Sequence, residues 1–305
     1  MSKAIRGSIS LVLLFGCCFL AALIALISHS ITQEYEKQLQ QLQFLQLRTL
    51  AESTIAGLAQ LSTQEEGTHQ LQAVTLYPGK HCASLSYSYF TSTDSCFSVL
   101  TAQAETKNAQ ANFQQLKFIP SDTIQSLANS YGVIASYGIT NSKYLPEGTL
   151  YTSNGNFTVP ELSFLAAYGR TALDLEELHS NGGNGSFIYI ENSTAQTRLT
   201  YNASLPVTKG TLLIASHGNI LVEKNFQAPN RLILLTDQGT ITLEDNVSLQ
   251  SALIISKGRL TIGKSCKLRG IFMAQDRIVL QGSCTITQDT DVVAPFVSPI
   301  HSFAE

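Results

Sequence analysis

The chain begins with an apolar run about one membrane thickness long. Residues 8–28 read SISLVLLFGCCFLAALIALIS and lie inside a stretch, residues 7–33, that carries no charge. A helix needs about 20 apolar residues to cross the hydrocarbon core of a bilayer. The pattern therefore predicts a transmembrane helix over residues 8–29.

Charges on either side of this run indicate its orientation. Lys3 and Arg6 belong to a short basic leader, residues 1–7, and the first charge after the run is Glu34. The positive-inside rule places the leader in the cytoplasm and the rest of the chain outside. A cleaved secretory signal is disfavoured because the run is long and no A-x-A motif follows it. Residues 14–17 resemble a lipoprotein signal, but the apolar run continues well past them.

Residues 30–62 contain no proline and continue the helical pattern as an amphipathic extension. Together with the span they predict one rod of about 54 residues, roughly 80 Å long. The first apolar stripe, expected to pack with other helices, is Ile31, Tyr35, Leu39, Leu42 and Leu45. The second stripe, expected to lie under a globular head, is Leu47, Leu50, Thr54, Leu58 and Leu61.

Alternation of apolar and polar residues replaces helical spacing over residues 68–119. Four strands are expected, at residues 70–76, 84–89, 96–100 and 112–118. They predict a small antiparallel sheet packed on the helix. Residues 120–184 are mixed, with short helices expected at residues 122–130 and 159–178.

From Thr211 the chain repeats four times, with periods of 20, 20, 19 and 18 residues. Each unit consists of short apolar strands separated by turns, and this self-similarity predicts a β-helix over residues 185–290. A tail, residues 291–305, is expected to cap or trail. Three columns should stack: Leu213, Ile233, Leu253 and Phe272 or Met273; Ile220, Ile241, Leu260 and Ile278; Phe226, Val247, Cys266 and Cys284.

The fold class is therefore α+β, with a long N-terminal helix, a small antiparallel β region and a C-terminal β-solenoid. We expect Ile233, Leu253 and Ile241 to point into the stacked coils. Each coil would bury its apolar residues only against its neighbours.

The N-terminus resembles that of a type IV prepilin. The leader MSKAIRG, the apolar run and the amphipathic helix carrying LAEST at residues 50–54 are most similar to minor pilins and type II secretion pseudopilins. The resemblance implies cleavage by a prepilin peptidase between Gly7 and Ser8, and assembly with other pilin-like subunits through the helix. The repeats after Thr211 resemble bactofilins and other short β-helix proteins, which is specific for fold and not for function.

Six cysteines fall into three pairs by spacing. Cys17 and Cys18 lie inside the predicted span and are expected to be inert. Cys82 and Cys96 flank a hairpin-like stretch and are a candidate disulfide, which an exported location permits. Cys266 and Cys284 occupy one column a coil apart, where they either bridge adjacent coils or stack as small apolar residues.

Motifs for catalysis, metal binding or cofactor binding are absent from the sequence, so we predict no enzyme, metal or cofactor. The six histidines are scattered without metal-ligand spacing. Glu244 and Asp245 form the only acidic doublet in the repeat and are interpreted as a solvated turn. Asp237 and Asp276 align in the repeats but are separated by two coils.

Composition fits an exported protein. Among 305 residues only 13% are charged, and the net charge is −3, so no nucleic-acid partner is expected. The hypothesis is a membrane-inserted, pilin-like protein of the cytoplasmic membrane, or of a pilus or cell surface, that displays its solenoid outside. The alternative is a permanently anchored surface protein whose solenoid binds cell wall or glycan. A glycan-active β-helix enzyme is a third class.

Overall fold

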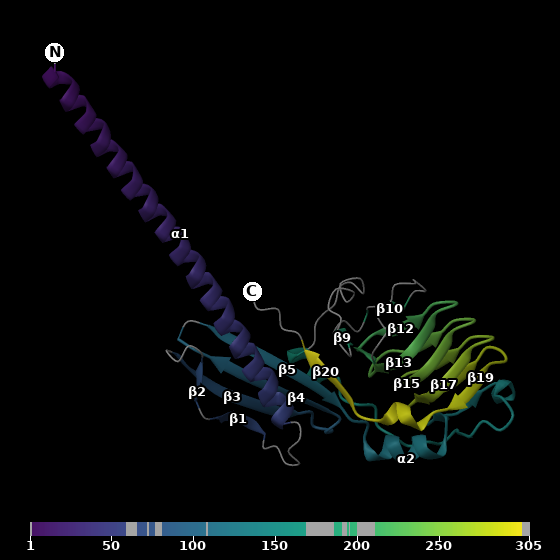
Figure 1. Cartoon of the computed structure of the whole chain (residues 1–305). Helices are drawn as coiled ribbons and strands as arrows, with labels where there is room; N and C mark the ends of the chain where they lie inside the picture. Colours follow the sequence, from purple (N-terminus) through teal and green to yellow (C-terminus); the bar gives the residue numbers. More distant parts are fainter. Residues whose placement is uncertain are drawn as a thin grey trace.

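A computed structural model describes residues 2–58, 66–71, 73–76, 81–107, 109–168, 186–190, 194, 196–199 and 211–300. For residues 2–16, 81, 186–190, 229, 299 and 300 only the backbone is described. The structure confirms the predicted fold class: a long N-terminal helix, a small antiparallel sheet and a β-solenoid of about six turns (Figure 1).

The helix α1 runs without a break from Ser2 to Leu58 and projects far beyond the rest of the molecule (Figure 1). Only its last turns are covered: Leu47, Ala51 and Ile55 are fully buried against the antiparallel sheet. The predicted second stripe thus begins correctly at Leu47. Ala51 and Ile55 then occupy the centre of the contact, while Leu50 and Leu58 pack at its edge.

The antiparallel sheet presents a surface of mostly small side chains to this helix. Alanines 102, 104 and 111 face the helix together with Leu85 and Leu100, and their small side chains let the helix approach the sheet closely. Three of the expected strands are confirmed near their predicted positions: β3 His81–Thr91, β4 Phe97–Glu105 and β5 Gln110–Phe118. The single strand expected at residues 70–76 is wrong, because two short strands, β1 Gly67–Gln70 and β2 Val74–Leu76, pair separately with β3.

The last strand of this sheet comes from the C-terminal tail. β20, Phe296–Ile300, pairs antiparallel with β5, with Phe296 opposite Phe118. The tail was expected to cap or trail, but it closes the sheet, in the order β1-β3-β4-β5-β20. The solenoid is therefore an insertion between two neighbouring strands. Arg231 holds the returning segment by donating hydrogen bonds to the carbonyls of Val292, Ala294 and Pro295.

Residues 121–168 join the sheet to the far end of the solenoid. The predicted helix is confirmed as α2, Asp122–Ser130, with Ser121 as its N-cap. The expected helix at residues 159–178 is wrong in its described part, which holds only the short 3₁₀ helix η2, Ser163–Ala167; its remainder lies outside the described residues. The other elements are β6 Val133–Ala135, β7 Ile139–Thr140, η1 Ser142–Tyr144 and β8 Tyr151–Thr152.

These short strands form a cap on the solenoid. β6 pairs in parallel with β17, Lys267–Ala274, and β7 pairs in parallel with β18, Ile278–Leu280. A segment that precedes the solenoid in sequence is therefore its last coil in space. The cap lies at the end of the solenoid far from α1 (Figure 1). It covers strand edges that would otherwise be open to pairing with another chain.

Two parallel sheets make up the solenoid. One follows the order β8-β6-β17-β15-β13-β11-β9, and β19 also pairs with β17; the other follows β10-β12-β14-β16-β18-β7. The strands are β9 Ser186–Ile190, β10 Gln196–Leu199, β11 Leu212–Ser216, β12 Asn219–Val222, β13 Gln227–Thr236, β14 Ile241–Leu243, β15 Ser248–Ser256, β16 Leu260–Ile262, β17 Lys267–Ala274, β18 Ile278–Leu280 and β19 Thr285–Gln288. The helix η4, Thr290–Val293, follows them.

The predicted columns are confirmed with one correction. Ile220, Ile241, Leu260 and Ile278 stack as expected. In the first column the residue beside Leu253 is Ile271, and Phe272 or Met273 was wrong. The pairing shifts between Leu249 and Ala252, where Gly270 adopts φ +148°. A Cβ there would lie 1.9 Å from the carbonyl oxygen of Ala252, so only glycine fits.

The direction of two predicted core residues is also corrected. Ile241 points into the solenoid as expected. Ile233 and Leu253 are fully buried, but on the outer face of their sheet, where they meet Ile124 of α2 and Leu165 of η2. Leu234 and Ile254 occupy the interior instead. The large sheet is therefore buried on both faces, which is why its strands read as continuous apolar runs.

Candidate functional site

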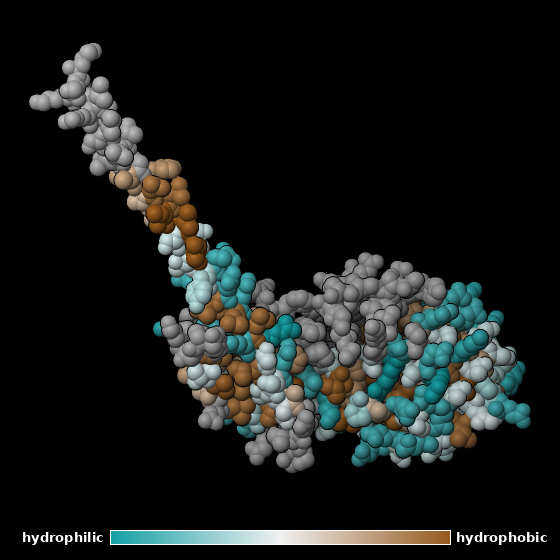
Figure 2. All heavy atoms as spheres, viewed as in Figure 1, coloured by the Kyte–Doolittle hydropathy of each residue, from teal (hydrophilic) through white to brown (hydrophobic). Residues whose placement is uncertain are grey.

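The most conspicuous candidate site is the projecting part of α1. This helix is long and apolar enough to cross a membrane, and its most apolar window is entirely exposed. Figure 2 shows these apolar side chains standing clear of the body. The large exposed ones are Phe19, Leu20, Leu23, Ile24, Leu26, Ile27, Ile31, Tyr35, Leu42, Phe44 and Leu45.

The solvent exposure of apolar side chains changes along α1 and divides the helix into a projecting part and a part packed on the sheet. Phe19 is 67% exposed and Ile31 is 64% exposed, whereas Leu47 is 0% exposed. After Arg6 the next charge along the helix is Glu34. The Arg48–Glu52 pair, 2.8 Å apart, lies where the helix reaches the sheet. An isolated helix that is apolar on all sides has no stable place in water.

A groove lies where the helix meets the sheet. It has a volume of about 370 Å³ and is lined by Leu45, Gln46, Thr49 and Leu50 of α1 and by Val74–Leu76 of β2. Leu45 also belongs to the exposed first stripe. The groove therefore continues that stripe onto the body of the protein.

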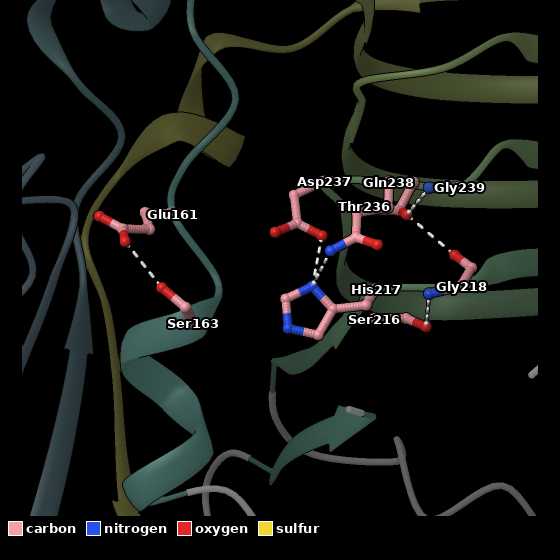
Figure 3. A network of polar contacts seen from close by, with 9 residues as sticks. All are labelled: Glu161, Ser163, Ser216, His217, Gly218, Thr236, Asp237, Gln238 and Gly239. Atoms are coloured by element: carbon pink, nitrogen blue, oxygen red, sulfur yellow. Dashed lines mark hydrogen bonds and ion pairs between the residues drawn. The ribbon is translucent and has the colours of Figure 1, made fainter. Parts of the chain in front are cut away.

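A polar cluster forms a second candidate, at one corner of the solenoid (Figure 3). The Nδ1 atom of His217 lies 2.6 Å from the Oδ1 atom of Asp237, and both side chains are largely buried. The two residues follow β11 and β13 in consecutive coils. Sequence reasoning missed this pair, although its spacing of 20 residues equals the period of the repeat.

The hydroxyl groups beside this pair are occupied by the backbone. Ser216 accepts a hydrogen bond from the N–H of Gly218, and Thr236 accepts one from the N–H of Gly239 while donating to the carbonyl of Gly218. Across from them in Figure 3, Ser163 donates to the carboxylate of Glu161. The hydroxyls of Ser216 and Thr236 therefore hydrogen-bond the backbone of the turns that follow their strands.

The acidic residues of the repeat also bind backbone. Glu244 accepts a hydrogen bond from the N–H of Lys224 at 2.9 Å, and Asp245 accepts one from the N–H of Lys264 at 2.7 Å. The doublet is therefore a bridge between coils and not the simple solvated turn that was expected. Asp276 lies 3.4 Å from Arg277, and Asp237 binds His217, so these two aspartates form no carboxylate pair.

All six cysteines are free thiols in the structure. Cys82 is the second residue of β3. Cys96 directly precedes β4, and Ser98 of β4 pairs with Thr91 at the opposite end of β3. About nine strand residues, roughly 30 Å, separate the two thiols along the sheet. A Cys82–Cys96 bridge is therefore incompatible with this register. Burial, with Asp94 nearby, raises the pKa of the Cys96 thiol to about 12.

The remaining predicted residues are placed as follows. Cys266 and Cys284 lie in adjacent coils, in the column that was expected. Gly7 and Ser8 lie in the backbone of α1, in the part whose side chains are not described. Among the described residues, no three His, Cys, Asp or Glu side chains gather in a way that could hold a metal ion.

Comparison with known proteins adds one weak likeness. No protein family model matches the chain, and no curated protein matches it. Among solved structures, the competence-associated pilin ComZ from Thermus thermophilus aligns over 85% of this chain and 97% of its own, with 8% sequence identity and a TM-score of 0.25. A likeness of this size establishes neither a family nor a function.

Proposed function

We propose that the chain is a pilin-like structural protein, held in the cytoplasmic membrane by α1 and displaying the solenoid outside. The observation that carries this proposal is the division of α1 into an exposed apolar part and a final part buried under the sheet. Removing apolar surface from water stabilises a protein by about 25 cal/mol per Å². A bilayer supplies that burial for the projecting helix, and the head stays in water.

The first stripe would serve assembly. Ile31, Tyr35 and Leu42 remain exposed beyond the predicted span, where a bilayer no longer covers them. Helices of other pilin-like subunits would pack on this stripe, and the groove beside Leu45 would receive the edge of such a contact. Function in this proposal comes from assembly and display, without catalysis.

Cleavage between Gly7 and Ser8 would prepare the helix for assembly. The leader carries Lys3 and Arg6, the charges that favour the cytoplasmic face. Its removal leaves an uncharged stretch that begins at Ser8, apart from the new terminal amine. The helix could then leave the bilayer and enter a bundle of similar helices.

Processing gives the direct test. The full chain is expressed in cells that carry a prepilin peptidase, and the intact mass of the wild type should lack residues 1–7. Gly7→Ala should keep them. Gly16→Ala, a glycine inside the same apolar run, should be processed like the wild type. A wild-type chain that keeps its leader in these cells contradicts the proposal and favours a permanent anchor.

Orientation is tested separately. Protease added to intact spheroplasts should digest the chain beyond about residue 30, because that part would face outward. Protection of the solenoid in intact spheroplasts, with digestion after lysis, would contradict an extracytoplasmic head.

Exposed tyrosines on the cap favour the second candidate, a surface protein that binds cell wall or glycan. Tyr137 is 78% exposed and Tyr151 is 47% exposed. Tyr137 follows β6 and Tyr151 begins β8, so both belong to the cap on the solenoid. Aromatic rings on such surfaces can stack on sugars. Binding of purified protein to cell-wall glycan should fall in Tyr137→Ala and Tyr151→Ala if this candidate holds.

A further inference from the structure

The column of side chains at one corner of the solenoid ends in two cysteines. Phe226, Val247, Cys266 and Cys284 follow one another in successive coils, and each is joined to the next coil by the same backbone bond. The carbonyls of Phe226, Val247 and Cys266 accept hydrogen bonds from the N–H groups of Ser248, Lys267 and Thr285, at 2.8, 2.9 and 2.8 Å. Cys266 and Cys284 are therefore direct neighbours in the stack.

We propose that Cys266 and Cys284 form a disulfide between adjacent coils and thereby lock the far end of the solenoid. Neighbouring strands lie about 4.8 Å apart, and a disulfide joins Cα atoms that are about 4.4–6.8 Å apart. Both side chains belong to the interior of the solenoid, where Cys266 is 1% exposed. The backbone around them is fixed on both sides, since Ser265 donates to Ser283 and Thr285 donates to Cys266.

The position of this pair, in the last coils of the solenoid, indicates what the bridge would stabilise. Each solenoid coil is stabilised by its neighbours, and the coil that contains β18 has a full neighbour on one side only. On the other side β18 pairs with just Ile139 and Thr140 of the cap. A covalent link from Cys266 to Cys284 spans this terminal coil and ties it to the coil before it.

Formation of the bridge needs a two-electron oxidant, and an external disulfide such as oxidised glutathione supplies one. Cys284 is partly exposed and is the point of attack. Its thiolate attacks one sulfur of the external disulfide, giving a mixed disulfide and releasing one thiolate. The thiolate of Cys266 then attacks Cys284, closing the intramolecular bond and releasing the second thiolate. The oxidant gains two electrons, and the two thiol protons pass to the released thiolates.

The folded environment makes this exchange slow once the coils have closed. Burial raises the pKa of Cys266, and burial beside Cys266 raises the pKa of Cys284 to about 11. Only thiolates attack disulfides, so few reactive groups exist at neutral pH. In the reduced protein the Cys266 thiol instead donates to the carbonyl of Glu244, 3.2 Å away. The bridge is therefore expected to form during folding, before the last coils pack.

Peptide mapping tests the bridge directly. The full chain in detergent is treated with oxidised glutathione, both as folded protein and during refolding from urea, and remaining thiols are then alkylated. Trypsin should release residues 265–267 linked to residues 278–305, because Lys264, Lys267 and Arg277 are the flanking cleavage sites. The linked peptide should appear on refolding. Its absence under both conditions would overturn the proposal.

A matched variant distinguishes a bond between cysteines stacked in adjacent coils from a bond formed by chance encounter in the unfolded chain. Val247→Cys combined with Cys266→Ala keeps two cysteines in the same column, but two coils apart, about 9–10 Å. On refolding with oxidised glutathione, the condition under which the wild type should link, this variant should form little of the link. Equal linking in the variant and in the wild type would show that the bond reports the unfolded chain, and would also overturn the proposal.

Thermal unfolding tests the lock. A reductant should lower the melting temperature of the oxidised wild type by about 5–10 °C and should leave Cys266→Val/Cys284→Val unchanged. No shift in the wild type means that the bridge stabilises nothing, against the proposal. The bridge does not depend on the membrane placement: linkage with glutathione, but not in chains isolated from cells, supports the bridge and counts against an exported head.

Discussion

The two β regions of the molecule bury their side chains by different rules. In β3 of the antiparallel sheet, Ala83 and Leu85 are buried while Cys82 and Ser84 are exposed. In β11 of the solenoid every residue is buried. The antiparallel strand alternates because the helix covers one face at this end, whereas the solenoid strand has an interior on one side and α2 with η2 on the other. Burial on both faces leaves the solenoid far less tolerant of change.

The two regions also differ in the backbone conformations that their turns require, and the corners of the solenoid are the more restrictive. The chain turns there with backbone touching backbone, so glycines 218, 239 and 258 follow one another in adjacent coils. The opposite turns use left-handed residues: Asn225, Asn246 and Ser265 have φ of 65°, 61° and 56°. The antiparallel sheet and α1 make few such demands. Glycine and asparagine thus matter in one region and hardly in the other.

The largest effect is expected where alanine replaces a corner glycine. A Cβ on Gly239 would lie 2.1 Å from the carbonyl oxygen of Gly218, and backbone cannot yield as a side chain can. Gly239→Ala should therefore cost more than about 4 kcal/mol of unfolding free energy, measured by thermal melting with circular dichroism.

Gly57→Ala is the matched control for that variant. Gly57 lies in α1, and a Cβ added there would meet nothing within 4 Å. Alanine also favours helix over glycine by about 0.5–1 kcal/mol. The two substitutions should shift stability in opposite directions. Similar shifts in both would contradict the close approach of the backbones at the solenoid corner.

A second effect separates the two parts of α1. Ile55 is 1% exposed against the sheet, and Ile31 is 64% exposed. Ile55→Ala should lower the stability of the head by about 2–5 kcal/mol because it leaves a cavity. Ile31→Ala should change the melting temperature of the detergent-solubilised subunit very little, yet weaken assembly. A large loss of subunit stability in Ile31→Ala would contradict the division of the helix.

A smaller effect is expected at the acidic bridge between coils. Glu244→Gln keeps an oxygen that can accept from the N–H of Lys224, so it loses only the contribution of the charge, about 1 kcal/mol or less. Glu244→Ala removes the acceptor and should cost more. Unchanged stability of Glu244→Gln together with loss of a measured glycan cleavage would identify the chain as an enzyme.

The smallest effect is a gain. Ser265 holds φ of 56°, and asparagine adopts this left-handed conformation more readily than serine. Asn246 already donates to Asn225 in the neighbouring coil at 3.2 Å. Ser265→Asn should add about 0.5 kcal/mol by extending this ladder, in urea unfolding. Ser265→Val, which resists positive φ, should destabilise the protein.

Most of the fold could be predicted from two features of the sequence, the repeats and the apolar run. The column of Ile220, Ile241, Leu260 and Ile278 follows from period alone, because each coil repeats the same local pattern. Inward and outward residues of the large sheet could not be told apart, since Ile233 and Leu234 are both apolar and both buried. The shift of strand register at Gly270 could not be predicted either, because a single glycine in a strand can mark a bulge, a bend or a close approach of another backbone.

Contacts between distant segments left no local signal. β20 pairs with β5 across the whole solenoid, and β7 pairs with β18 from the other side of the insertion. Nothing in the tail sequence distinguishes a sheet strand from a trailing end. The His217–Asp237 pair is different: its spacing of one repeat was available, and a search of the columns for polar partners would have found it.

The insertion between β5 and β20 determines how the molecule carries mechanical load. Phe118 and Phe296 are paired at the end of the sheet where the solenoid is attached. A pull on the far end of the solenoid therefore draws β5 lengthwise against β4. The two strands are paired along their whole length, from Phe97 opposite Phe118 to Glu105 opposite Gln110, so all hydrogen bonds between them resist the pull together. Strands loaded in this direction shear and do not unzip one bond at a time. In the proposed assembly, tension on the tip of the solenoid would reach α1 through the direction in which the sheet is strongest.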